Sequence, residues 1–567
     1  MKNILFIGIV SVLLFSCKKE QPQKSTPEII GVVSENAMVV SAREEVSKIG
    51  NLILKKGGNA FDAMAGMELA LAVAYPYAGS LGGGGFMVYR LEDGSIGSLD
   101  FREKAPLAAT KNMYLDPETE EVIPNKSTLG AMAVGIPGNI AGIYASHEKF
   151  GKLPMEAIIT PVIALAKKGV VVTKKQQERL ENYREYFLKV NDSNFFLAKA
   201  WKANDTIKRI QLAKTLERLK ENGRDEFYKG ESAQILVDFM QKSGGIMTMD
   251  DLAKYEVKWR TPITFTYDDL RVISMSPPSS GGVCLAEIMK AIEPYNLDEF
   301  GHNSVKAIQL ITEAERRAYA DRSYFLGDPD FVTIPLETLL SENYLNKRME
   351  SFSFEKATPS SEVSHGTIEI VESDETTHYS IVDQFGNAVS VTTTINGAYG
   401  SKLFCEELGF FLNNEMDDFS AKPGVPNMFG LIGAKANSIA PEKRMLSSMT
   451  PTIVEKNGNL YMVVGTPGGS TIITSVLQTI LNVHEYDMGM QEAINQPRFH
   501  HQWLPDTVKM EPIGFSAELQ AELTKLGYTI DATNSPVIGK VEGILILSDG
   551  KLEGGADPRG DDKAVGY

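Results

Sequence analysis

Two runs of alternating apolar and polar residues, at positions 377–383 and 387–394, follow a polar and acidic stretch that starts near residue 357. Alternation with period two and a high content of Thr, Val, Ile and Tyr is typical of β-strands. The runs are joined by Gln384-Phe385-Gly386, and a three-residue loop that ends in glycine favours a type I turn with a bulge. The pattern therefore predicts a β-hairpin whose first strand begins where an irregular loop ends.

The predicted hairpin brings two threonines together. If the strands pair symmetrically about Phe385, position 376 lies opposite position 394, because both are nine residues from the centre. Directly opposed residues have Cβ atoms roughly 4.5–5.5 Å apart, which allows their hydroxyl groups to hydrogen-bond, whereas a slip of one residue would turn Thr394 to the other face. We therefore expect Thr376 to face Thr394, although an ordinary threonine-rich hairpin would have the same pattern.

The rest of the chain alternates extended and helical patterns. Residues 44–56 and 60–74 have apolar positions at helical spacing, and the second run is so apolar that we expect it to be buried. A helix is also predicted over residues 313–324. Gly82-Gly83-Gly84-Gly85 precede a strand at residues 86–90 and are not followed by Gly-Lys-Ser/Thr, which favours tight backbone packing over a phosphate-binding loop. Strands flanked by helices on both sides predict a layered α/β or α+β fold.

Composition narrows the possible partners and cofactors. The chain has 567 residues, a formal net charge of −16 and a pI near 5.1, so it lacks the basic stripe that neutralises nucleic-acid phosphates. Cys284 and Cys405 stand in apolar contexts without the spacing of metal ligands, which predicts buried packing residues. His500 and His501 lack a third ligand at useful spacing. We expect no metal, no cofactor and no nucleic-acid partner.

The first residues have the pattern of an export signal. Lys2 precedes an apolar run at residues 4–15 that is too short to span a bilayer comfortably, so residues 1–16 are predicted to be a signal peptide. Leu14-Phe15-Ser16-Cys17 resembles the lipobox of bacterial lipoproteins, in which the cysteine becomes the lipidated first residue. Residues 17–30 would then form a tether. We expect export in a bacterium to the periplasm, with a lipid anchor at Cys17.

Thr376 is a candidate nucleophile. A threonine hydroxyl is weak at neutral pH and needs a base beside it, and the α-amine of the same residue can be that base once the residue is a chain terminus. Cleavage after Glu375 would supply this amine. The polar stretch before Thr376 predicts a loop that solvent can reach, which suits such a cut.

Five runs, in order along the chain, resemble the γ-glutamyltransferases of the N-terminal nucleophile hydrolase superfamily. The likeness extends from about Gly31 to the C-terminus. The runs are residues 99–103 (Leu-Asp-Phe-Arg-Glu), 376–380 (Thr-Thr-His-Tyr-Ser), 412–419 (Leu-Asn-Asn-Glu-Met-Asp-Asp-Phe), 441–449 (Pro-Glu-Lys-Arg-Met-Leu-Ser-Ser-Met) and 465–470 (Gly-Thr-Pro-Gly-Gly-Ser).

The resemblance implies a proenzyme that cuts itself between Glu375 and Thr376. Residues 31–375 would form a large subunit and residues 376–567 a small one, intertwined as a heterodimer. The implied fold is α+β, a four-layer αββα sandwich formed jointly by both subunits. The implied activity is acyl transfer from γ-glutamyl compounds such as glutathione to water, amino acids or peptides, without a cofactor.

The resemblance also implies the catalytic roles. Thr376 Oγ would attack the γ-carbonyl and form a γ-glutamyl ester, while its α-amine takes the proton and Thr394 lies opposite. The backbone N–H groups of Gly468 and Gly469 would stabilise the oxyanion. Glycine suits this place because no side chain blocks the approach of the backbone.

The implied donor pocket holds both charges of the glutamyl α-carbon. Arg102 would bind the α-carboxylate as a bidentate fork, with further hydrogen bonds from Ser447 and Ser448. The α-ammonium group would be held by three other side chains. These are Asp418, Asn396 and Glu415.

Two features bear on specificity and access. The acyl side chain of the substrates that cephalosporin acylases cleave has no α-ammonium group. A carboxylate at position 418 would therefore have no positive group of such a substrate to pair with. Asp418 therefore favours a glutamyl donor. Residues 423–430 resemble the lid loop that covers the donor pocket in many bacterial members, and Phe429 stands where those often have an aromatic gate.

Two alternatives stay open. The chain could be another N-terminal nucleophile acylase, of the cephalosporin acylase kind, or a non-catalytic lipoprotein that binds small amino acids. The second alternative predicts one intact polypeptide, whereas two fragments meeting at Thr376 would exclude it. His378 lies two residues from Thr376 on the same strand face, and we expect a structural role for it because the mechanism needs no imidazole.

Overall fold

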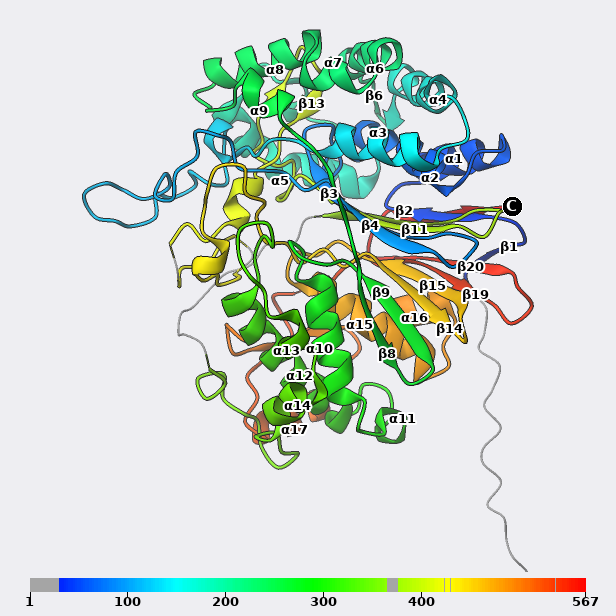
Figure 1. The fold of residues 1–567 in the computed structure, drawn as a ribbon, viewed down its shortest axis with the longest axis vertical. Helices are drawn as coiled ribbons and strands as arrows, with labels where there is room; N and C mark the ends of the chain where they lie inside the picture. The colour runs from blue at the N-terminus through cyan, green and yellow to red at the C-terminus, as the bar shows by residue number, and fades with distance from the viewer. Residues whose placement is uncertain (1–29, 365–375, 423, 429, 536) are drawn as a thin grey trace, which may run out of the picture.

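Two β-sheets lie face to face at the centre of the molecule, and helices cover the outer face of each sheet (Figure 1). This arrangement confirms the α+β four-layer αββα sandwich expected from the sequence. Residues 1–16, expected to be a signal peptide, and Cys17 lie outside the described part of the chain. The computed structural model describes residues 30–364, 376–422, 424–428, 430–535 and 537–567.

The first sheet has the predicted hairpin, β10 and β11, at its centre. Because this hairpin lies between β2 and β3, the segments before and after position 376 interleave in one sheet. In order across the sheet, the strands are β21 (Lys563–Gly566), β2 (Met38–Ser41), β10 (Thr377–Val382), β11 (Ala388–Thr394), β3 (Gly84–Arg90), β4 (Ile96–Asp100) and β7 (Lys258–Arg260).

The second sheet packs against the first through an apolar layer that includes Met38, Val88, Ile273, Val463 and Ile544. Strands β15 and β19 of this sheet contact β10 of the first sheet. In order, its strands are β1 (Val32–Ser34), β20 (Leu552–Ala556), β19 (Glu542–Ile546), β15 (Asn459–Gly465), β14 (Thr452–Lys456), β9 (Leu270–Ser274) and β8 (Ile263–Tyr267).

Helices form the two outer layers. Helices α1, α2 and α3 contact the first sheet, α10, α15 and α16 contact the second, and α12 packs on α10 (Figure 1). None of the helices in the described residues is both long and apolar enough to cross a membrane. The main helices are α1 (Glu44–Lys55), α2 (Ala60–Ala74), α3 (Asn139–Phe150), α4 (Met155–Lys168), α5 (Lys174–Val190), α6 (Ile210–Asn222), α8 (Glu231–Lys242), α10 (Gly281–Ile292), α12 (Val305–Phe325), α15 (Thr471–His484), α16 (Met490–Asn495) and α17 (Ala517–Lys525).

Helix α2 and the two cysteines agree with the sequence analysis, whereas helix α12 differs from it. Every residue of α2 is buried, as its apolar pattern predicts. Cys284 and Cys405 are buried free cysteines. The predicted start of α12 at residue 313 is wrong, because the helix begins at Val305, where the Ser304 hydroxyl caps it by accepting a hydrogen bond from the N–H of Ala307.

The register of the hairpin is the one that symmetry about Phe385 predicts. Thr377 pairs with Thr393 and Val382 pairs with Ala388, so each pair of numbers is centred on 385. Gly386 has φ of 92°, a backbone conformation that favours glycine and that the bulged turn requires. Continuing this register by one residue places Thr376 opposite Thr394.

The glycine run before β3 packs tightly against β11, as predicted. β3 pairs with β11 so that Gly84 lies beside Thr394. A Cβ atom on Gly83 would lie 2.1 Å from the carbonyl oxygen of Thr394. These glycines therefore let the backbone of β3 approach the end of β11 and fix the position of Thr394.

The close approach of Gly83 to Thr394 predicts the effect of one added methyl group. Gly83→Ala forces the strand ends apart, and such overpacking typically costs about 1–3 kcal/mol. We expect a lower midpoint of urea unfolding, measured by circular dichroism, together with reduced activity because Thr394 moves. An unchanged midpoint with full activity would contradict the contact.

Candidate active site

The predicted site residues gather around one cavity at the end of the hairpin. Thr376 is buried just before β10, and Thr394 is the last residue of β11. The Oγ1 atom of Thr394 accepts a hydrogen bond from the N–H of Asn396 over 2.7 Å. This bond uses one acceptor position of the hydroxyl group, whose proton remains available for donation. The cavity is lined by Thr376, Thr394, Arg102, Asn396, Glu415, Asp418, Ser447, Ser448 and Gly469, together with Arg322, Leu431, Met449 and Ile472.

Gly468 and Gly469 form the turn that leads into helix α15. Gly468 has φ of 140° and Gly469 has φ of 53°, and a Cβ on Gly468 would lie 2.4 Å from Thr471 Oγ1. Neither N–H donates a hydrogen bond to any residue that the structure describes. Two unpaired N–H groups beside the positive end of a helix dipole suit an anionic oxygen.

Arg102 lies among the buried carboxyl groups of Glu103 and Glu415 and the partly buried carboxylate of Asp418. Its Nη1 contacts Glu415, its Nη2 contacts Asp418, and Glu103 Oε2 is 3.8 Å from Nη1. Burial works to lower the pKa of Arg102, but Glu415 and Asp418 raise it, so the guanidinium stays charged. The cavity itself measures about 20 Å³, which is room for about one water molecule. A ligand larger than a water molecule therefore has to displace side chains that line the cavity.

The three carboxylates titrate at unusually high pH. Burial raises the pKa of Asp418 to about 6 and that of Glu103 to about 8, while the pull of Arg102 works the other way. Burial also raises the pKa of Glu415 well above its ordinary value. Near neutral pH the cluster therefore holds protons that a bound ammonium group would displace.

Ser447 and Ser448 lie on a loop that is held by the turn before helix α10. The N–H of Ser280 donates to Ser447 O over 2.8 Å, and the Ser280 hydroxyl donates to the same carbonyl over 2.7 Å. The Ser279 hydroxyl donates to Met449 O. This turn places both serines in the cavity opposite Gly469.

Part of the predicted lid loop is described. Met428 N donates to Asp417 Oδ2 over 2.8 Å, and Asn427 Nδ2 donates to Asp418 Oδ1 over 3.1 Å. Leu431 lines the cavity. Phe429 and Glu375 lie outside the described residues, so the gate and the upstream side of the cleavage position stay predictions.

The histidines lie in packed positions, as the sequence analysis expects. His378 is fully buried, with Nδ1 2.9 Å from Thr392 Oγ1 and Nε2 3.0 Å from Ser380 Oγ. Burial lowers the pKa of His378 to about 3, so the ring is neutral. His500 and His501 are buried as well, and His500 Nδ1 lies 2.9 Å from Thr474 Oγ1.

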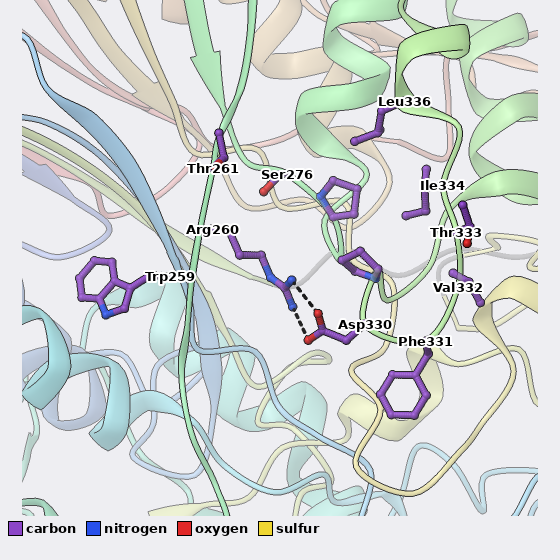
Figure 2. A pocket seen from close by; sticks show the side chains of 12 residues that line it. Trp259, Arg260, Thr261, Ser276, Asp330, Phe331, Val332, Thr333, Ile334 and Leu336 are labelled. Atoms are coloured by element: carbon purple, nitrogen blue, oxygen red, sulfur yellow. Dashed lines mark hydrogen bonds and ion pairs between the residues drawn. The ribbon is translucent and has the colours of Figure 1, made fainter.

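A larger cavity, of about 680 Å³, lies outside this site (Figure 2). Its walls come from the β7–β8 crossover and the loop after α12, and they include Trp259, Phe331 and Ile334. Its charged groups, Arg260 and Asp330, pair with each other over 3.2 Å. None of the predicted site residues lines it. Size alone therefore does not identify the reactive centre.

Sequence reasoning missed two charged residues of the site. Glu103 follows Arg102 directly, and both of its buried carboxylate oxygens lack a hydrogen-bond partner. Arg322 reaches the cavity from helix α12. The one available signal was that residues 313–322 carry six charges on a helix next to apolar turns, which alone is typical of a solvated helix.

Comparison with known proteins places this site in a family. A family model described as gamma-glutamyltranspeptidase matches residues 46–567. The glutathione hydrolase proenzyme of Escherichia coli (strain K12) is 42% identical, with 99% of this chain and 98% of that protein covered. The chain belongs to the gamma-glutamyltranspeptidase family. As a member of that family it is an enzyme.

Other relatives agree with this membership. The glutathione hydrolase proenzyme of Bacillus subtilis (strain 168) is 35% identical, covering 100% of this chain and 98% of that protein. The crystal structure of Helicobacter pylori gamma-glutamyltranspeptidase is 40% identical with a TM-score of 0.56, covering 62% of this chain and 99% of that chain. A cephalosporin acylase from Bacillus halodurans has a TM-score of 0.84 at 24% identity, covering 98% and 99%, and so shares the fold.

The raised pKa of Glu103 predicts a pH effect on this transpeptidase-family protein. Folding raises the pKa of the Glu103 carboxyl group to about 8, so the folded state binds this proton more tightly than the unfolded state does. The resulting stabilisation is complete at pH values below the pKa of the unfolded state, and it is lost as pH rises through 8. Glu103→Gln should therefore lose less thermal stability than the unmodified protein between pH 6 and pH 9, measured by differential scanning fluorimetry. Replacing the exposed Glu118 by Gln is the control. Identical pH profiles for all three proteins would contradict the assignment.

Proposed function

We propose that the chain is a self-processing γ-glutamyltransferase and glutathione hydrolase that works through a γ-glutamyl ester on Thr376. The observation that carries the proposal is the meeting of Thr376 and Thr394 at a cavity that holds groups of both charges and Gly469, beside a turn in which the N–H groups of Gly468 and Gly469 bond to no described residue. The names of the relatives in Escherichia coli and Bacillus subtilis support glutathione as a donor and a proenzyme as the first product.

Processing comes first. Hydrolysis of the peptide bond between Glu375 and Thr376 leaves a carboxylate on Glu375 and an α-amine on Thr376. The products are a large subunit of residues 31–375 and a small subunit of residues 376–567. They stay together because β10 and β11 lie between β2 and β3.

Donor binding then exchanges ion pairs inside the pocket. The donor α-carboxylate takes the place of Asp418 at Arg102 and receives hydrogen bonds from the Ser447 and Ser448 hydroxyl groups. Asp418, released from Arg102, pairs with the donor α-ammonium group, with Asn396 and Glu415 beside it. Because Arg102 and Asp418 already pair with each other, only a zwitterionic donor supplies a new partner to both of them at once.

Acyl transfer follows at Thr376. Its Oγ attacks the γ-carbonyl, its α-amine takes the hydroxyl proton, and Thr394 donates a hydrogen bond that orients the attacking oxygen. The oxyanion is held by the N–H groups of Gly468 and Gly469. The proton passes to the leaving amine as the amide bond breaks. Water, an amino acid or a peptide amine then attacks the ester, which returns the hydroxyl to Thr376.

Asp418 favours this function over that of an acylase. A cephalosporin-type side chain has no ammonium group, so it would leave the buried Asp418 carboxylate without a partner after separating it from Arg102. A non-catalytic amino-acid-binding protein would need neither the Thr376–Thr394 pair nor two free N–H groups. We also propose export to the periplasm, with signal residues 1–16, tether residues 17–30 and a lipid anchor at Cys17.

Substitution of Thr376 tests processing and catalysis together. The unmodified protein should purify as two fragments, with Thr376 at the new N-terminus. Thr376→Ala should remain one polypeptide and be inactive, because both the nucleophile and its base are lost. Thr376→Ser, the matched control, should still be cleaved and active, since it keeps a hydroxyl group. Intact mass, N-terminal sequencing and release of p-nitroaniline from γ-glutamyl-p-nitroanilide measure these outcomes. Cleavage of the alanine variant would refute the mechanism.

The pKa of Asp418 predicts how donor affinity depends on pH. Burial raises this pKa to about 6, so the carboxylate takes up a proton as pH falls through 6 and no longer attracts the donor ammonium group. We expect KM for γ-glutamyl-p-nitroanilide to rise about tenfold between pH 7 and pH 5. Steady-state kinetics across this range measures it.

Two controls separate this effect from protonation elsewhere. Glutaryl-p-nitroanilide lacks the ammonium group, so its KM should not rise over the same range. Asp418→Asn should raise KM for the γ-glutamyl donor at pH 7 and remove most of the pH dependence. A parallel rise in KM for both donors would rule out Asp418 as the ammonium partner.

A further inference from the structure

The donor cavity contains a second buried guanidinium that the proposed mechanism does not use. Arg322, near the end of helix α12, is 3% exposed and lines the same cavity as Thr376. It also lines an adjoining cavity together with Asp418, Val425 and Asn427. A buried cation at a binding cavity needs either a carboxylate partner or a ligand that takes that place.

Arg322 fixes both serines of the α-carboxylate subsite. Its Nη2 donates to Ser448 Oγ over 3.0 Å, and its Nε donates to Ser280 Oγ over 2.9 Å. The Ser280 hydroxyl in turn donates to Ser447 O over 2.7 Å. One side chain therefore holds Ser448 directly and Ser447 through Ser280.

These bonds determine which way the serine hydroxyl groups point their protons. A guanidinium only donates, so Ser448 Oγ is the acceptor in its bond with Arg322 and its own proton is left for another acceptor. Ser447 Oγ likewise accepts from the N–H of Met449 over 3.1 Å. Both hydroxyl groups are thereby free to donate to a ligand, and a carboxylate is a ligand that only accepts.

The two arginines of the cavity differ in their charge balance. Arg102 contacts Glu415 and Asp418, with Glu103 nearby, so its charge has carboxyl partners at close range. Arg322 makes no ion pair with any carboxylate among the described residues. Burial lowers the pKa of Arg322, although Asp418 is among the groups that partly oppose this. The positive charge without a partner in this cavity belongs to Arg322.

We propose that Arg322 is a positioning residue for the donor α-carboxylate: it holds the Ser448 hydroxyl as a hydrogen-bond donor and supplies the uncompensated positive charge behind it. The inference rests on the proposed function, because it concerns the same donor pocket. It adds Arg322, acting with the serines, to Arg102 as a group that selects for the α-carboxylate, while Arg102 also holds Asp418 and Glu415 in place before the donor arrives.

Two donors that differ only in the α-carboxylate test the proposal. These are γ-glutamyl-p-nitroanilide and 4-aminobutanoyl-p-nitroanilide, in which hydrogen replaces the carboxylate. Arg322→Gln should lower the ratio of their kcat/KM values by about 10- to 100-fold, since a hydrogen bond to a charged group is worth roughly 1.5–3 kcal/mol. Most of the loss should lie in KM for the γ-glutamyl donor. The ratio is independent of the active fraction, because both donors are measured on one preparation.

Matched variants separate positioning from a general loss of structure. Arg317 lies on the same helix but pairs with Glu313 and lines a different cavity, so Arg317→Gln should leave the donor ratio unchanged even if stability falls. Ser448→Ala should lower the donor ratio. Because Arg322 acts partly through Ser448, Arg322→Gln should lower the ratio less in the Ser448→Ala variant than it does in the unmodified protein. Arg322→Lys keeps the charge and should give an intermediate ratio. If Arg322→Gln is not cleaved or does not fold, the donor ratio of Arg322→Lys tests the proposal, and an unchanged ratio in that variant would contradict it.

The outcomes distinguish this inference from the proposed function. If the unmodified protein turns over neither donor, the proposed function fails. If it prefers the γ-glutamyl donor but the Arg322 variants lose activity on both donors in parallel, only the role of Arg322 is refuted. The inhibition constants of glutamate and 4-aminobutanoate, measured as competitive inhibitors, compare binding with and without the α-carboxylate and need no turnover of either compound. A slow reaction of 4-aminobutanoyl-p-nitroanilide therefore does not prevent the comparison.

Discussion

The antiparallel register of β10 and β11 is the constraint on which the site depends. Pairing that is symmetric about Phe385 puts the residue before β10 opposite the last residue of β11, and a slip of one position would turn Thr394 away from Thr376. Several features hold that register in place. Gly386 supplies the positive φ of the turn, Asp383 accepts hydrogen bonds from the turn and from the N–H of Ala60, and Gly83 allows β3 to approach Thr394. The meeting of Thr376 and Thr394 is thus a consequence of strand pairing in the most central part of the first sheet.

The sequence was sufficient for this hairpin because its information is local. Turn length, the terminal glycine and the alternation of residues all lie within residues 376–394, and each of them indicates the same register. The same holds for α2, whose apolar composition predicts a helix buried on all sides. The start of α12 was harder, because the helix begins with Val305-Lys306, which is not a strong helix-forming pair, and depends on the cap at Ser304.

The charge pattern of the pocket could not be predicted from the chain in the same way. Arg102 and Asp418 are 316 residues apart, and Arg322 reaches Ser448 across 126 residues. Resemblance to a family supplied Arg102 and Asp418 as binding residues, but not their contact with each other in the empty cavity. Glu103 was missed because its place in the cluster depends on Arg102, Glu415 and Asp418 meeting in the folded chain, which no local sequence pattern indicates. Charged residues that are far apart in the sequence are recognised as one site only when the fold places them together.

The arrangement of charges explains how a nearly closed pocket can still bind a doubly charged ligand. An empty site lined by one unpaired arginine and one unpaired carboxylate would be unstable, because each buried charge would be desolvated without compensation. Here Arg102 and Asp418, the groups proposed to bind the donor, neutralise each other's charge until a zwitterion separates them. The charge of Arg322 is stabilised by hydrogen bonds to hydroxyl groups instead of by a carboxylate. Hydroxyl groups stabilise a cation less than a carboxylate does, so this guanidinium retains attraction for an anion. A monoanion would approach Arg322 but leave the ion pair of Arg102 and Asp418 intact, whereas a cation would pair with Asp418 but offer no anion to Arg322. In the proposed function, the pocket therefore selects for a ligand that carries an ammonium and a carboxylate group on the same carbon atom, which is the chemistry of an α-amino acid.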